Sequence, residues 1–224
     1  MRAAIGLAIA VSVWLAGSLS AAHAAMSVSI SAHPPSDYVA ISQTASGDYA
    51  LEWQFKPSQK RDVGQTFRTS AAFALDKITI LAAGQTGAWG AGFELDLYEF
   101  PQAPALSAAV CLGSQAGTLP TQSALANDFY LTFDIANLGL AAGKDYGFLL
   151  RFTPASGTRI VTVRHSDDGT AYPDGTCFED TGSGVFAARD ADVVFYLERH
   201  VPEPASLFLL ALGLAGMRTL RRRR

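Results

Sequence analysis

The chain has 224 residues, of which 49% are hydrophobic and 17% are charged. Soluble domains usually carry about a quarter of charged residues, and apolar segments at both ends lower the fraction here. Between residues 25 and 200, eleven basic residues stand against nineteen acidic residues, a net charge of −8. This acidic balance argues against nucleic acid as a partner and is compatible with cations or neutral sugars.

The first 24 residues have the layout of a secretory signal peptide. Arg2 supplies the positive start, an apolar core covers residues 5–19, and Ala22-His23-Ala24 fits the small-x-small cleavage rule. We therefore expect the mature chain to begin at Ala25. The alternative is an uncleaved anchor, for which a core of about 15 residues is short of the ~20 needed to cross a bilayer.

Residues 25–200 predict one all-β domain, a single antiparallel β-sandwich of jelly-roll type. Apolar and polar side chains alternate repeatedly, and Gly/Pro-rich turns separate the alternating stretches. The pattern predicts strands at residues 38–42, 48–55, 66–68, 75–81, 93–98, 129–135, 146–152, 158–165 and 192–198. One helical turn is expected near residues 123–126, and no repeat or second domain is predicted.

Trp89 stands between glycines in the stretch AAGQTGAWGAG. One reading is that the indole caps the edge of the sandwich. The other is an exposed platform on which a sugar ring stacks, with Tyr172 on the same rim. That second reading makes Trp89 and Tyr172 candidate carbohydrate-binding residues.

The sequence holds two cysteines, Cys111 and Cys177. In an exported protein such a pair predicts a disulfide, which would stabilise the fold by roughly 4 kcal/mol in the chain-entropy model. The alternative is two unrelated buried thiols.

An acidic, glycine-containing stretch covers residues 166–180. Carboxylates on flexible turns suit Ca²⁺, although the spacing does not match an EF-hand. The alternative is a solvated acidic loop. The candidate calcium ligands are Asp167, Asp168, Asp174, Glu179 and Asp180.

No arrangement of residues in the sequence predicts catalysis. The histidines lack a zinc-ligand spacing, and neither a Gly-x-Ser-x-Gly elbow nor a phosphate-binding glycine loop occurs. Glu94 and Glu99 could be posed as a glycosidase pair, but Glu94 is the outward residue of an alternating strand. We therefore expect a protein that is not an enzyme and needs no cofactor, Ca²⁺ apart.

The chain ends with a three-part segment at residues 201–224. A Pro-Glu-Pro triplet comes first, then an apolar run that predicts a transmembrane helix at 205–220, then an arginine cluster that the positive-inside rule keeps cytoplasmic. The prolines favour an extended segment at the membrane surface. The residues that define the segment are Val201, Pro202, Glu203, Pro204, Arg218, Arg221, Arg222, Arg223 and Arg224.

This segment resembles the PEP-CTERM sorting signal of exported proteins in Gram-negative bacteria that make extracellular polysaccharide. The resemblance implies recognition by exosortase, a membrane-embedded cysteine transpeptidase, with the triplet as the processing region. It also implies an inner-membrane precursor that passes through the export machinery and reaches the cell surface or the extracellular matrix.

The body is also similar, more loosely, to bacterial exported jelly-roll domains. The similarity lies in Gly64-Gln65-Thr66-Phe67, Leu75-Asp76-Lys77-Ile78, the ELDLYEF stretch and LAAGKDYGFLL. It implies that the Gln-x-Phe strand and the Leu-x-x-Gly-x-x-Tyr corner are packing features.

Together these patterns predict a non-catalytic exported surface or matrix protein in a biofilm or polysaccharide context. The alternative is a carbohydrate-binding module with a structural calcium site. A third hypothesis, an extracellular hydrolase, needs two carboxylates that converge in a cleft.

Overall fold

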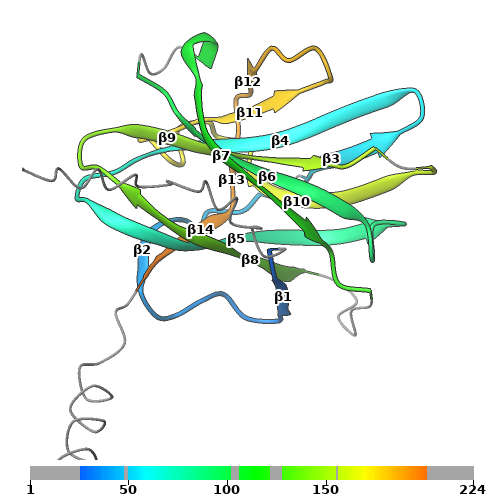
Figure 1. Ribbon diagram of the computed structural model, residues 1–224, viewed down its shortest axis with the longest axis horizontal. Coiled ribbons are helices and arrows are strands. Elements are labelled where there is room, and N and C mark those ends of the chain that lie inside the picture. The colour runs from blue at the N-terminus through cyan, green and yellow to red at the C-terminus, as the bar shows by residue number, and fades with distance from the viewer. Residues whose placement is uncertain (1–25, 48–49, 102–105, 122–127, 155, 201–224) are drawn as a thin grey trace, which may run out of the picture.

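A computed structural model describes residues 26–47, 50–101, 106–121, 128–154 and 156–200. These residues form an all-β, antiparallel fold, as the alternation predicts, and its one regular helix in the described ranges is the 3-10 turn η1 (Figure 1). The elements are β1 Val28–Ser31, β2 Val39–Gln43, β3 Ala50–Lys56, β4 Gln59–Arg68, β5 Phe73–Thr86, β6 Gly92–Glu99, η1 Leu106–Ala108, β7 Val110–Thr118, β8 Phe129–Leu140, β9 Asp145–Phe152, β10 Arg159–Ser166, β11 Cys177–Asp180, β12 Ala187–Ala188, β13 Asp192–Val193 and β14 Phe195–Arg199.

The strands form two layers that share β4. The first sheet has the order β7-β6-β9-β4-β11, with β12 beside β11. The second sheet contains β1-β8-β5-β10-β3, and β14 pairs with β5 and β2. The start of β4 pairs with β3, whereas its remainder pairs with β9 and β11. One strand therefore takes part in both layers.

The core lies between the two layers. Apolar residues at alternate positions of the predicted strands point into it, for example Phe93, Phe133, Phe148 and Phe195, each at most 1% exposed. Phe93 of the first sheet contacts Phe133 of the second with ring centroids 5.3 Å apart, and Phe148 contacts Phe195 at 6.0 Å. Burial of each such ring stabilises the fold by about 1.5–3 kcal/mol.

The predicted disulfide is wrong, because both cysteines are free and lie on strands far apart in the same sheet. Cys111 is exposed on β7 and Cys177 is buried on β11. Four strand spacings of about 4.8 Å separate β7 from β11, or roughly 19 Å. A disulfide needs Cα atoms within about 7 Å of each other.

Several predicted segments lie outside the described residues. These are the signal peptide at 1–24, the helical turn at 123–126, and the sorting segment with its transmembrane helix at 205–220. Among the ranges that the structure describes, no helix is long and apolar enough to cross a membrane.

Two of the strands that the alternation did not predict are β7 and β11. The sequence of β7, VCLGSQAGT, has no period-2 pattern, because most of this edge strand is exposed. The sequence of β11, CFED, is buried at all four positions, so it lacks the alternation of a half-buried strand, and it lies within the acidic stretch that predicts a loop.

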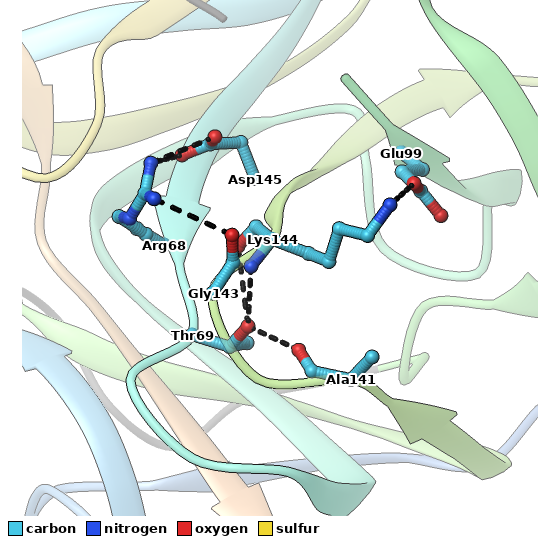
Figure 2. Close-up of polar contacts among 7 residues, drawn as sticks. All are labelled: Arg68, Thr69, Glu99, Ala141, Gly143, Lys144 and Asp145. Carbon is cyan, nitrogen blue, oxygen red and sulfur yellow. Dashed lines mark hydrogen bonds and ion pairs between the residues drawn. The ribbon is translucent and has the colours of Figure 1, made fainter. Parts of the chain in front are cut away.

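A tyrosine corner closes the turn between β8 and β9, as the similarity to exported jelly rolls implied. The backbone N–H of Ala141 donates to the Tyr146 hydroxyl at 3.0 Å, and Gly143 adopts a positive φ of 72°. Thr69 braces the same turn, since its hydroxyl donates to the Lys144 carbonyl at 3.1 Å (Figure 2). The turn thus fixes the ends of β4 and β9.

Candidate functional site

The described body ends directly before the predicted sorting segment. β14 pairs with β5 as far as Arg199, and the backbone N–H of His200 donates to the Ala74 carbonyl at 2.7 Å. The residues of the triplet itself lie outside the described ranges. The sequence therefore places the processing region one residue after the last backbone bond of the described sandwich.

The acidic residues of the predicted calcium loop differ in their surroundings. Asp168 accepts from the backbone and hydroxyl of Thr170, which lowers its pKa. Asp180 accepts from the backbone N–H groups of Gly182 and Gly184 at 2.7 and 3.1 Å. Asp167 and Asp174 are exposed.

The fifth carboxylate, Glu179, is buried between the guanidinium groups of Arg61 and Arg189. In the part of the chain that the structure describes, no three His, Cys, Asp or Glu side chains form a group suited to a metal ion. The geometry does not bring the five residues together, and calcium binding at this loop stays a prediction.

The two candidate stacking residues lie in different surroundings. Trp89 is half-buried and packs against the main core, with its ring 5.5 Å from that of Phe129. Sugar stacking by its exposed part stays a prediction. Tyr172 is only 9% exposed and lies edge-on to Phe195 at 5.3 Å, so the prediction that it stands on an exposed rim is wrong.

A buried aspartate that sequence reasoning missed explains the position of Tyr172. Asp192 is fully buried, and its carboxylate accepts from the Tyr172 backbone N–H at 2.9 Å and from Gln65 Nε2 at 3.0 Å. Burial raises the pKa of Asp192. Gln65 also accepts from the Val193 backbone, so the Gln-x-Phe strand holds the acidic loop against the sandwich.

A first cavity, of about 270 Å³, lies between this loop and the adjacent ends of β4 and β9. Arg68 and Asp145 line it and form an ion pair at 3.1 Å, which Figure 2 shows beside the Lys144–Glu99 pair. Gly175 lines it from the loop, where a Cβ would lie 2.0 Å from the Thr66 carbonyl oxygen. The loop is therefore pressed closely onto β4.

The outer face of the first sheet carries a second apolar cluster, which we call the outer-face cluster. Phe100, Leu149 and Phe178 are at most 2% exposed, although they lie on the side of the sheet away from the main core. The cluster is completed by partly buried side chains of Tyr98, Leu106, Ala109 and Phe186. Segments after β6 and after β11 cover it.

Ionised groups lie beside the outer-face cluster on the same face. Asp96 is fully buried and forms an ion pair with Arg151, which also pairs with Glu94 at 3.3 Å. Tyr98 donates its hydroxyl to Asp96 at 3.2 Å. Burial and the Asp96 charge raise the pKa of Tyr98, so the hydroxyl remains a donor.

A further carboxylate, that of Asp62 on β4, lies on the same outer face. It pairs in register with Asp180 across β4 and β11, and its side chain is 2.7 Å from Lys60 Nζ. Burial raises the pKa of Asp62 to about 6, and the nearby Lys60 ammonium offsets only part of this rise. We call Asp62, Glu94, Asp96, Arg151 and Asp180 the outer-face ion network.

A second cavity, of about 420 Å³, opens where the outer-face cluster meets this network. Arg151 and Asp180 line it together with Tyr98, Leu106, Val185 and Phe186. The alternation of β6 places Glu94, Asp96 and Tyr98 on one face. What it could not predict is that distant segments would cover that face.

Glu94 and Glu99, the two carboxylates considered as a glycosidase pair, have different partners. Glu94 pairs with Arg151, whereas Glu99 pairs with Lys144 at 2.8 Å (Figure 2). Each carboxylate thus has a cation as its own partner.

Comparison with known proteins identifies the C-terminal segment. Residues 200–224 match the PEP-CTERM protein-sorting motif. This motif marks the chain as an exported protein that is sorted by exosortase and made as a membrane-anchored precursor. The resemblance drawn from the triplet, the apolar run and the arginines is confirmed.

No curated protein matches the chain. Among solved structures, it is similar to the infectious bursal disease virus VP2 subviral particle, with 13% identity and a TM-score of 0.30 over 87% of this chain and 50% of that chain. For the structure of the infectious bursal disease virus Gt strain, identity is 11% and the TM-score 0.22, over 87% and 48%. The chain spans about half the length of each viral chain, and neither likeness bears on function.

Proposed function

We propose that this chain is a non-catalytic surface or matrix protein that exosortase releases from the inner membrane in an extracellular-polysaccharide or biofilm context. The observation that carries the proposal is the sorting motif at residues 200–224, which follows directly after β14. The acidic, two-layer β body is consistent with a passenger that is delivered outside the cell by this tail.

The test is the intact mass of the protein from its native host, measured in inner membrane, outer membrane and medium. The proposal expects a body that ends near Pro202 and is found beyond the inner membrane. A variant with Pro202, Glu203 and Pro204 replaced by alanine should keep its full tail and stay at the inner membrane.

A matched control separates loss of the motif from loss of any proline. Pro154→Ala with Ser156→Ala changes two exposed residues between β9 and β10, and this variant should be processed normally. Normal processing of the triplet variant would overturn the proposal. A full tail on the wild-type protein would show a plain anchor instead.

A second candidate function, saccharide binding, is favoured by one observation. The second cavity, beside the outer-face cluster, combines aromatic side chains with charged groups whose positions are fixed by other residues. Binding sites for small ligands have this composition.

A further inference from the structure

The outer face of the first sheet is built differently from an ordinary solvent-facing side. In a two-layer antiparallel fold that side is normally polar. Here Phe178 and Phe100 are buried on it, and glycines below them make room. A Cβ on Gly64 would lie 2.4 Å from the Phe178 ring, and one on Gly147 would lie 2.8 Å from Phe100. Two strand positions without side chains thus let the aromatic rings approach the sheet closely.

The ion network beside these rings is costly for the fold. Asp62 and Asp96 are fully buried, and the Oδ1 atom of each has no hydrogen-bond partner among the described residues. Buried polar atoms without partners destabilise a protein by about 1–3 kcal/mol each. Apolar residues would cover this face at lower cost, so a role in binding is the better reason for the network.

The cavity between cluster and network has the size and chemistry of a ligand site. Its volume of about 420 Å³ lies within the range of small-ligand pockets, roughly 300–1,000 Å³. Tyr98 and Phe186 line one part of it with aromatic surface, and their rings contact each other edge to face at 5.2 Å. Neither ring is fully buried.

The two charged residues that line the cavity are held in place by other residues. Arg151 is bound by the buried Asp96 and by Glu94, and Asp180 is bound by the backbone of Gly182 and Gly184. A guanidinium offers a planar set of donors and a carboxylate offers acceptors, a combination that suits adjacent hydroxyl groups. Because both groups are already fixed, a ligand would lose little free energy in ordering them.

The charge around the cavity disfavours anionic ligands. The cavity region holds more negative than positive groups, and the whole body is acidic. The cations are Arg151 and Lys60, and the carboxylates are those of Asp62, Glu94, Asp96 and Asp180. Like charges in an interface disfavour binding, so carboxylated sugars are poor candidates.

We propose that this cavity binds pyranose units of an uncharged polysaccharide, an inference that rests on the proposed extracellular-polysaccharide context. The sugar's apolar face packs against Tyr98 and Phe186. Its hydroxyls hydrogen-bond to Arg151 and Asp180.

Calorimetric titration of the purified full-length chain in mild detergent tests this proposal. The probes are cellotetraose and mannotetraose as uncharged ligands and a tetramer of guluronate as the anionic ligand. At least one uncharged tetramer should bind, and the guluronate tetramer should bind at least about tenfold more weakly. No binding of either uncharged tetramer up to about 10 mM would overturn the proposal.

Two variants locate the site. Ser107 is exposed and lines the cavity, so Ser107→Trp should fill the cavity without disturbing either core. Arg151→Lys keeps a positive charge beside Asp96 but removes the planar set of donors. Each variant should weaken binding at least about tenfold. The melting temperature of each shows whether it is folded, and Ser107→Trp decides the matter if Arg151→Lys does not fold.

Matched controls complete the design. Ser156→Trp introduces the same side chain on an exposed loop away from the cavity, and Arg68→Lys makes the same change at the first cavity. Neither should alter binding. Loss of binding in Arg68→Lys with normal binding in Arg151→Lys would place the sugar in the other cavity and overturn the proposal. Since the assay uses purified protein, its failure leaves the sorting proposal untouched, and a failure of sorting leaves the binding result valid.

Discussion

The two faces of the first sheet use the same strands in opposite ways. On the inner face, alternate residues such as Leu95, Phe148 and Leu150 belong to the main apolar core and join the sheet to its partner. On the outer face, the intervening residues Asp96, Leu149 and Arg151 mix apolar and ionised groups under a cover of short segments. The inner face maintains the fold, whereas the buried charges of the outer face are explained by the ligand site that we propose there.

The largest difference in stability between the two faces is expected when an aromatic ring is removed from each. Phe93→Ala deletes a fully buried ring that contacts both Trp53 and Phe133, and should lower the free energy of unfolding by about 4 kcal/mol. Phe186→Ala on the outer face removes a partly exposed ring and should cost about 1 kcal/mol. Chemical denaturation measures both values, and equal losses would mean that the outer-face cluster is a second structural core.

The next effect concerns the glycines under the outer-face rings. Gly64→Ala should destabilise the protein by about 2 kcal/mol, because the new methyl group would clash with Phe178 and with the Phe148 carbonyl. Gly113→Ala on β7 is the matched control, since nothing lies within 4 Å of its Cβ position. The difference between their unfolding midpoints gives the result. A harmless Gly64→Ala would show that the rings are not held closely on the sheet.

Asp62 should make stability depend on pH. Its folded pKa of about 6 lies above the ordinary 3.8, so the folded state holds the proton more tightly than the unfolded state. The contribution of Asp62 to stability is therefore largest below about pH 4 and is lost as the pH rises through 6, by about 3 kcal/mol.

The variant Asp62→Asn should abolish most of this slope between pH 4 and 7 and raise stability at pH 7.5. Asp145→Asn, which weakens the exposed pair with Arg68, should change stability by less than about 1 kcal/mol. Denaturation curves at several pH values provide the measurement. An unchanged slope in Asp62→Asn would assign the pH dependence to other groups.

The smallest effect is expected at the exposed Cys111, for which the buried Cys177 is the comparison. Cys177→Ser places a hydroxyl in the main core and should cost about 1–2 kcal/mol, in line with the burial that raises the pKa of the Cys177 thiol to about 12. Cys111→Ser on the exposed strand should change the melting temperature very little, in oxidising or reducing buffer. A drop for Cys111→Ser in oxidising buffer alone would restore the disulfide between the two cysteines.

Local sequence was sufficient for the C-terminal sorting motif and for most of the strands. The triplet with its apolar run and arginines is contiguous, so its chemistry can be read without a fold. The alternation in residues 93–98, 129–135 and 146–152 predicted β6, β8 and β9, because a strand repeats every two residues whatever lies beside it.

Only the tertiary structure decided what covers the outer face and how far apart distant residues lie. Phe178, Asp62 and Arg151 come from three strands that become neighbours only in the folded sheet. The buried position of Tyr172 depends on its hydrogen bond to Asp192, twenty residues away in the sequence. The cysteines are kept apart by strand order, which a count of cysteines does not contain. Periodicity specifies which side chains share a face, whereas burial of that face depends on long-range contacts that no local pattern encodes.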